Sequence, residues 1–378
     1  MLTFRSNRHE PLHLQASERI RQLIRRRHLQ PGAALPTIQE LCKYLGLSYV
    51  TVHKALAVLA RKGLVQPIRG KGTFVSARGD AEQGHSQIGL VSAGSYEAML
   101  TVPYSLDTFR GVVGAASAAH ADVRIFSLRV PGERLSQGEL TQMDVDGLLV
   151  VELTDPAMMR QFANAGVPVV VADACTPEVP LDYVVCDNEG GAAHAVRHLI
   201  GLGHRRIHYI GGYAVHPVTR AYVESWDARS RCRGYRDAMT QAGLTPVCHA
   251  WAENDLQSKD ATRWYSQVAR QITAGRNGPT AVVTYDCRVA QILAYRLAEA
   301  SVEVPRDLSV AAVAGATSES LLSKQPLAYC AFDFLSMGSE ATRILLSRYQ
   351  QPQAPLEQAN IHRIGFTFVP GATCAAPR

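Results

Sequence analysis

At 378 residues the chain exceeds one ordinary hydrophobic core and is long enough for two or three folding units. Its 47% hydrophobic and 19% charged residues are typical of a globular protein, and no window approaches the roughly 18 uninterrupted apolar residues of a membrane span. The polar, basic start leads into no apolar signal segment, which predicts a cytoplasmic protein without membrane association.

Charge is divided unevenly along the chain. Residues 1–78 carry 14 Lys and Arg against three acidic residues, a net charge of +11, whereas the remaining 25 basic and 30 acidic residues give −5. A positive excess that fills a whole domain is typical of a segment that meets phosphates. The eight cysteines are scattered singly, with no spacing typical of zinc sites, so we expect free thiols, no metal and no cofactor.

The basic segment begins with two predicted helices. Apolar residues at helical spacing predict the first helix over 11–27, which a Pro-Gly pair ends. Thr37, with Glu40 three residues later, forms the pattern of a capping box, in which each residue satisfies free backbone amides at a helix start. A short second helix is therefore expected over 38–45.

A third helix is predicted over 48–62, with Ser48 as its N-cap. Because Gly46 leaves only a tight turn between the second and third helices, the pair is expected to form a helix-turn-helix whose later member enters the major groove. The predicted buried stripe has the spacing i, i+3, i+4, i+7 and consists of Val52, Ala55, Leu56 and Leu59.

After the third helix, short strands at 64–66 and 73–75 flank a basic, glycine-rich tip. Arg69 and Lys71 supply positive charge, and Gly70 permits close approach to the DNA backbone or minor groove. This hairpin is the wing of a winged helix-turn-helix.

The run LQPGAALPTIQELCKYLGLSYVTVHKALAVLARKGLVQPIRGKGTFV, with the helix before it, resembles the DNA-binding domain of the GntR family over essentially its whole length. The resemblance implies a homodimer on a short palindromic operator of double-stranded DNA. By matching position it implies DNA contacts from Gln39, Tyr49, Val50, Thr51, His53, Arg69 and Gly70.

Each of these side chains also has a structural interpretation. Thr37 and Ser48 are caps first and phosphate contacts second, and Lys54 is either a phosphate contact or a solvated charge. Tyr49 and His53 lie on the exposed face of the predicted recognition helix, which favours contact with DNA.

The chain departs from the family pattern where bases are read. The family usually has arginine at the positions of Gln39, Tyr49 and His53. Since arginine pairs with guanine and glutamine favours adenine, the operator is expected to differ from the common family half-site.

Residues 77–86 are small, polar and aperiodic, which predicts a linker between a DNA-binding domain at 1–76 and a second domain at 87–378. In the second domain apolar strands alternate with helices, a pattern typical of parallel sheets covered on both faces. The pattern restarts near residue 189, which predicts two doubly wound lobes with a ligand cleft between them. Strands are expected at 88–91, 124–126, 147–151, 167–171, 207–210, 281–284 and 308–311, and helices at 106–119, 156–165, 189–202, 228–242 and 286–300.

This second domain resembles the sensor domain of the LacI family, which is similar to periplasmic sugar-binding proteins. The likeness rests on DNEGGA at 187–192, HLIGLGHRRI at 198–207, IGG at 210–212, SRCRGY at 230–235 and VPRDLSV at 304–310. The fold class expected is therefore multidomain: a small α+β winged helix-turn-helix, then a two-lobed α/β domain of the type I periplasmic-binding-protein kind. The combination resembles an arabinose-responsive type of repressor.

The second resemblance implies a small-molecule effector, a sugar or sugar derivative, held between the lobes. It places Arg231 on the effector, and a guanidinium can bind two sugar oxygens or a carboxylate. The alternative is a salt bridge from Arg231 that ties the lobes together. The other implied effector positions are Tyr96, Glu152, Asp173, Tyr285 and Asp286, of which Asp286 is equally a plain N-cap. Structural roles are expected for Asp187, Asn188, His204 and Arg205.

Two departures concern the effector. Where the family has an aspartate after the strand near 310, this chain has Ala314-Gly315, and Leu256 stands in place of an aromatic residue. Sugar stays the leading class, with a non-sugar metabolite as the alternative.

We expect a transcription regulator, a repressor in which ligand closes the lobes and alters the spacing of the DNA-binding heads. Induction and corepression are both open. An enzyme is the first alternative, but the phosphate-loop, dinucleotide, G-x-S-x-G and H-E-x-x-H motifs are missing from the sequence. A transport-associated binding protein is the second, which the basic head and the lack of a signal segment oppose.

Overall fold

The computed structural model describes residues 12–27, 29–61, 63–76, 86–92, 96–127, 140, 143, 145–153, 155–212, 214–215, 222–223, 225–249, 261–274, 278–315, 321–322, 325–350 and 356–378. The residues up to Gln87 form one compact unit, the head, and most of the remaining chain forms a second, the body. The predicted linker falls almost wholly outside the described residues, so the bounds 1–76, 77–86 and 87–378 stay predictions. In the described part, no helix is long and apolar enough to span a membrane.

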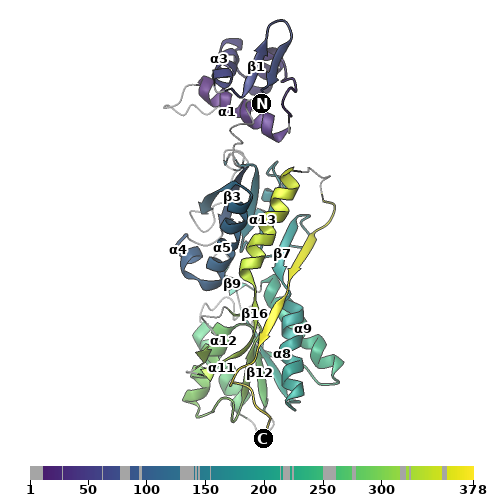
Figure 1. The fold of residues 1–378 in the computed structure, drawn as a ribbon. Coiled ribbons are helices and arrows are strands. Elements are labelled where there is room, and N and C mark those ends of the chain that lie inside the picture. The colour runs from purple at the N-terminus through teal and green to yellow at the C-terminus, as the bar shows by residue number, and fades with distance from the viewer. Residues whose placement is uncertain are drawn as a thin grey trace. The chain divides into compact units, whose positions relative to one another are not determined.

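The head consists of three helices and a two-stranded hairpin (Figure 1). Its elements are α1 (Leu12–Arg26), α2 (Ile38–Leu45), α3 (Tyr49–Arg61), β1 (Val65–Ile68) and β2 (Gly72–Val75). The periodic apolar residues of the helices converge on one core, and each large aliphatic side chain buried there stabilises the fold by about 1.5–3 kcal/mol. Fully buried members are Ala16, Ile20, Leu41, Val52 and Ala55. The predicted winged helix-turn-helix is confirmed.

The body contains two six-stranded sheets, each the centre of one lobe. In the first lobe the strand order is β17-β7-β6-β5-β3-β4, and in the second it is β11-β8-β12-β13-β16-β18. The described pairings are parallel except that β18 runs antiparallel to β16. The predicted two-lobed, doubly wound α/β fold is therefore confirmed.

The first lobe is built from β3 (Ser86–Ser92), α4 (Tyr96–Thr101), α5 (Pro103–Ala118), β4 (Ala121–Ser127), β5 (Gly147–Val151), α7 (Pro156–Ala163), β6 (Val169–Ala172), β7 (Asp182–Cys186), α13 (Phe334–Gln350) and β17 (Asn360–Ile364). The second lobe is built from α8 (Asn188–Gly201), β8 (Ile207–Ile210), α9 (Trp226–Gln241), β11 (Val247–His249), α11 (Ala261–Thr273), β12 (Ala281–Thr284), α12 (Cys287–Glu299), β13 (Ser309–Ala312), β16 (Ala328–Phe332) and β18 (Phe366–Val369). Two small hairpins are β9 (Ala214–Val215) with β10 (Tyr222–Val223), and β14 (Leu321–Leu322) with β15 (Gln325–Pro326).

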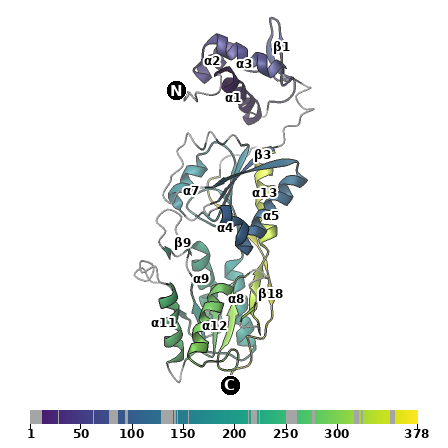
Figure 2. The same ribbon diagram turned by 90° about the vertical axis from the view of Figure 1, so that its left-hand side faces the viewer.

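The chain passes between the lobes three times, a feature that the sequence pattern does not reveal. It enters the second lobe after β7, returns for α13 and β17, and crosses again into β18. Figures 1 and 2 show α13 beside α5, against the sheet of the first lobe. The two lobes are therefore not two successive stretches of sequence, as the restart near residue 189 suggests.

Glycines bring α5 and α13 into close contact. A Cβ on Gly111 would lie 2.0 Å from the carbonyl oxygen of Leu335, and a Cβ on Gly338 would lie 2.1 Å from that of Thr108. The backbones therefore approach each other more closely than any residue with a side chain allows at these positions. This packing fixes the returning helix to the first lobe.

Candidate DNA-binding surface and effector site

In the head, α2 begins with the predicted capping box. The Thr37 N–H donates to Glu40 Oε2 at 2.7 Å, and the Glu40 N–H donates to Thr37 Oγ1 at 3.3 Å. The bonds from Thr37 also lower the pKa of Glu40. The turn after α2 uses Gly46 in the left-handed conformation, as the sequence predicts. Thr37 therefore acts as a cap, while Gln39 lies exposed one residue into the helix.

The start of α3 combines a structural cap with an exposed apolar pair. Ser48 Oγ accepts from the Thr51 N–H at 3.4 Å and lies 2.9 Å from the Thr51 hydroxyl, which confirms the predicted cap. Tyr49 and Val50 are 57% and 62% exposed. Neither an aromatic nor a β-branched side chain is needed on a helix face that contacts only water. Such exposed side chains on the second helix of a helix-turn-helix are typical of base contacts.

Tyr49 and His53, one turn apart on α3, stack on each other. Their ring centroids are 6.0 Å apart and the ring planes differ by 18°. Both residues and Lys54 are exposed, so the helix presents two aromatic rings and a cation to solvent. Thr51 is half-buried, which makes it the least accessible of the predicted contacts on this helix.

The wing is a hairpin in which Val65 pairs with Val75 and Ile68 with Gly72. Its tip consists of exposed Arg69, Gly70 and Lys71. Gly70 has φ +77°, a left-handed conformation that glycine adopts without strain. The head therefore presents α3 and a basic tip, and contact of these residues with DNA stays a prediction.

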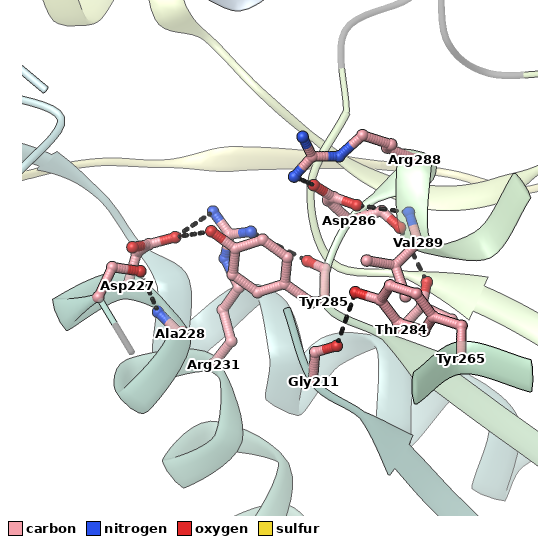
Figure 3. Close-up of polar contacts among 11 residues, drawn as sticks. Gly211, Asp227, Ala228, Arg231, Tyr265, Thr284, Tyr285, Asp286, Arg288 and Val289 are labelled. Carbon is pink, nitrogen blue, oxygen red and sulfur yellow. Dashed lines mark hydrogen bonds and ion pairs between the residues drawn. The ribbon is translucent and has the colours of Figure 1, made fainter. Parts of the chain in front are cut away.

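In the body, Arg231 is buried in α9 and lies between Asp227 of the same helix and Tyr285, which follows β12 (Figure 3). Its Nε donates to Asn188 Oδ1 at 2.7 Å and its Nη1 donates to the Tyr285 carbonyl oxygen at 2.9 Å. Nη2 lies 3.4 Å from Asp227 Oδ2, an ion pair within one helix. This pair does not bridge the lobes, which weakens the alternative that Arg231 ties them together.

Tyr285 lies directly against Arg231. The guanidinium carbon is 4.2 Å from the centre of the Tyr285 ring, and the Tyr285 hydroxyl donates to Asp227 (Figure 3). The ring fits because Gly212 has no side chain: a Cβ there would lie 2.0 Å from it. Arg231, Tyr285 and Asp227 thus form one packed cluster, hereafter the arginine cluster.

Asp286 follows Tyr285 and caps α12. Its Oδ1 accepts from the Val289 N–H at 2.7 Å, and its Oδ2 lies 3.4 Å from Arg288 (Figure 3). The cap interpretation of Asp286 is confirmed, and a contact with effector stays a prediction.

Two acids stand at the carboxyl ends of neighbouring strands in the first lobe. Glu152 follows β5 and Asp173 follows β6, and both have left-handed backbones, with φ +58° and +57°. This conformation costs a non-glycine residue of order 1–3 kcal/mol, and such strain is concentrated at functional sites. The Glu152 carboxylate also accepts from the Ser105 hydroxyl.

Both carboxyl groups resist ionisation. Burial raises the pKa of Glu152, although the hydrogen bond from Ser105 opposes the shift. Burial, followed by the charges of Glu152 and Asp227, raises the pKa of Asp173 well above its ordinary value, while Arg231 opposes this. The charges of Asp227 and Arg231 thus act on Asp173, which links this acid of the first lobe electrostatically to the arginine cluster of the second.

These raised pKa values predict a pH dependence of stability. A carboxyl whose pKa is higher in the folded state contributes stability below its unfolded pKa of about 4, and that contribution is lost as pH rises through the folded pKa. We expect the double variant Glu152→Gln, Asp173→Asn to be more stable than the parent at pH 8, with the difference vanishing near pH 4. Urea unfolding at several pH values measures this. Parallel curves for parent and variant would contradict the assignment of raised pKa values to these two acids.

Three other predicted positions differ in outcome. The side chain of Tyr96 and residue Leu256 lie outside the described residues. Ala314-Gly315 replaces the family aspartate, and a Cβ on Gly315 would lie 2.1 Å from Cys287 Sγ. A larger side chain therefore does not fit at Gly315 in this packing.

Two site residues escape the sequence analysis. Asn188, expected to be structural, is buried and holds Arg231, and Asp227 pairs with both Arg231 and Tyr285. The i, i+4 spacing of Asp227 and Arg231 on a helix is a readable signal for a pair. By contrast, Asp187 is the predicted cap, since it accepts from the Gly190 N–H at 3.0 Å.

Comparison with known families agrees with this architecture. Residues 12–75 match the model of bacterial regulatory proteins of the gntR family, and residues 196–374 match the periplasmic binding protein-like domain. The chain joins a GntR-family DNA-binding head to a body with a periplasmic-binding-protein-like domain. Both predicted resemblances are confirmed.

Curated proteins that the chain resembles are transcriptional regulators. The chain is 27% identical to the arabinose metabolism transcriptional repressor of Geobacillus stearothermophilus, over 79% of this chain and 81% of that protein. It is 30% identical to the transcriptional repressor PurR of Photobacterium profundum over 45% of this chain, and this match spans about half of PurR, 48%. The fold resembles that of the lac repressor dimer bound to operator and the anti-inducer ONPF, with TM-score 0.61, 20% identity, and coverage of 79% of this chain and 98% of that chain. The last likeness concerns the fold alone.

Proposed function

We propose that this chain is a sequence-specific transcription regulator of the cytoplasm, whose hold on a DNA operator is controlled by a small effector bound in the body. The observation that carries the proposal is the pairing of two features in one chain. The head exposes Tyr49, Val50 and His53 on a recognition helix, and the body holds half-buried acids of both lobes whose charges interact with the buried Arg231.

The DNA part of the proposal rests on charge and exposure. Residues 1–78 have a net charge of +11, which attracts phosphates irrespective of sequence. Sequence is then read by side chains that reach base edges, and Tyr49, Val50 and His53 are the exposed candidates on α3. Arg69 and Lys71 at the wing tip would contact the backbone or minor groove.

The effector that fits best is rich in hydroxyl groups. Glu152, Asp173 and Asp227 supply hydrogen-bond acceptors, whereas Arg231 supplies donors that are already engaged. Sugar hydroxyls can donate to carboxyl oxygens and can accept from a carboxyl that its raised pKa keeps protonated, so a hydroxyl-rich ligand suits either protonation state. The arabinose repressor of Geobacillus stearothermophilus supports the same class by its name. We therefore propose a sugar or sugar derivative.

Assembly and response follow from the same relatives. We propose a homodimer on a palindromic operator, as the lac repressor dimer binds its operator, and repression as the regulatory effect. In this mechanism effector shifts the population of two body conformations, and the heads change their spacing relative to the half-sites. An enzyme is disfavoured because the relatives are regulators, and a transport protein is disfavoured by the basic head.

The DNA contacts can be tested through salt dependence. The logarithm of the affinity for duplex DNA should fall linearly with the logarithm of salt concentration, by about 0.9 for each phosphate contact. Lys54→Ala and Lys71→Ala should each reduce that slope by about one where the lysine meets a phosphate, and leave it unchanged where it is a solvated charge. Arg233→Ala, an exposed cation of the body, is the matched control. Affinity that is indifferent to salt would contradict the proposal.

A further inference from the structure

Two cysteines of the second lobe lie within reach of each other. All eight cysteines are free thiols, and Cys232 Sγ lies 3.2 Å from Cys248 Sγ. Cys232 is buried in α9, while Cys248 is half-buried in β11. The contact joins a helix to a strand across 16 residues of chain.

Cys248 also has a cation beside it. The Nε of Arg236, one turn after Cys232 on α9, donates to Cys248 Sγ at 3.3 Å. Tyr209 and Tyr235 are the other titratable groups whose ionisation is coupled to this sulfur. The hydrogen bond from Cys232, followed by Arg236, lowers the pKa of Cys248 to about 7 against the burial that raises it. This thiol therefore ionises more readily than an ordinary cysteine.

Three of the other thiols differ in this respect. Burial raises the pKa of Cys175, Cys330 and Cys374 to about 12. Since the thiolate is the nucleophile, these cysteines are expected to be inert where Cys248 reacts. Cys374 is half-buried, as Cys248 is, so access alone does not distinguish them.

We propose that Cys232 and Cys248 form a disulfide-forming oxidation site that responds to hydroperoxides. The Cys248 thiolate attacks one oxygen of hydrogen peroxide, the O–O bond breaks, and the other oxygen leaves as hydroxide and takes up a proton. The sulfenic acid formed on Cys248 is then attacked by the Cys232 sulfur after loss of its proton. The S–S bond forms as the S–O bond breaks and water leaves. The two thiols together lose two electrons, and these reduce one peroxide to two waters.

The geometry allows this bond with a small movement. A disulfide bond is about 2.05 Å long, so the sulfurs must approach each other by roughly 1 Å. β11 is a three-residue strand at the edge of the sheet and pairs with β8. A shift of β11 therefore disturbs the backbone hydrogen bonds to one neighbouring strand. The bond would tie β11 to α9 directly after Arg231.

The test uses the full chain, reduced, then treated with hydrogen peroxide and digested for mass spectrometry. We expect one linked peptide pair, Cys232 to Cys248, which dithiothreitol reverses. In Cys232→Ser the sulfenic acid cannot be resolved, so dimedone should label Cys248. In Cys248→Ser, peroxide should leave Cys232 unmodified. Cys374→Ser is the matched control and should behave as the parent.

A second measurement does not depend on the cysteine variants. Iodoacetamide at pH 7 should alkylate Cys248 at least about tenfold faster than Cys374, because so little of the latter is thiolate. Arg236→Gln should move the alkylation midpoint of Cys248 upward, whereas Arg233→Gln, on the same helix, should not. A dimedone adduct on Cys248 of the parent without a disulfide, or equal reactivity of Cys248 and Cys374, would overturn the proposal.

Discussion

Replacement of Arg231 by alanine is expected to abolish the effector response and to lower the melting temperature of the body, while operator binding survives below that temperature. The variant leaves Asn188 Oδ1 and the Tyr285 carbonyl oxygen without their donors, and Asp227 without its ion pair. Removal of one partner from a buried pair costs about 3–5 kcal/mol. DNA binding resides in a separate unit, the head. Thermal unfolding followed by titration of effector against operator-bound protein measures both effects.

Arg233→Ala is the matched control for that experiment. Arg233 lies two residues further along α9 and pairs with Glu189 at 2.9 Å, but its side chain is 63% exposed. An exposed pair contributes about 0–1 kcal/mol, so this variant should resemble the parent. If Arg231→Ala instead unfolded as the parent does and still responded to effector, Arg231 would have no place in the site.

The second large effect is expected on α3. Tyr49→Ala and His53→Ala should each weaken binding to the operator by about 1–3 kcal/mol for each base that the side chain reads, without a change in melting temperature. Because the two rings stack, the double variant should be weakened by less than the sum of the two single effects. A fluorescence anisotropy titration against operator and against unrelated duplex separates specific from non-specific binding.

Tyr295→Ala provides the comparison for the α3 variants. Tyr295 is 62% exposed, much as Tyr49 is, but it lies on α12 of the body. Arg69→Ala should weaken binding to both duplexes alike, since a backbone contact carries no sequence information. Recognition-helix variants that bind operator as the parent does would show that α3 does not read the bases.

Local features of the fold could be predicted from the sequence because their partners are close in the chain. Thr37 and Glu40 are three residues apart, so the capping box is visible in the residue types alone. Seven strands of the body are likewise visible as short apolar runs, whereas β7, β11, β16, β17 and β18 are not among the predicted strands. The return of α13 to the first lobe has no such signal, because its buried stripe would suit either sheet. Its location depends on Gly111 and Gly338, more than 200 residues apart.

In the effector site, too, local features could be predicted and contacts between distant residues could not. The family resemblance is the sequence evidence for Arg231. Its role in the arginine cluster depends on Asn188, which lies 43 residues away and has the local sequence pattern of a turn or cap residue. Asp286 has the local pattern of a cap and is one. The left-handed backbones of Glu152 and Asp173 could not be predicted, since only a few per cent of non-glycine residues adopt that conformation, although aspartate does so more often than most.

The proposed function requires that one chain reads a DNA sequence with α3 and releases or tightens its hold when the body binds an effector. Two successive experiments on the full-length protein test DNA reading and effector response together. Random duplex DNA is first selected for binding, and occupancy of the enriched sequence by the protein is then measured in the presence of a panel of pentoses and disaccharides. We expect a twofold-symmetric motif, and one compound that changes its occupancy at least about tenfold in the parent but not in Arg231→Ala, a coupling of about 1.4 kcal/mol or more. Enrichment of no motif above non-specific binding, or an equal response of parent and Arg231→Ala, would contradict the proposed function.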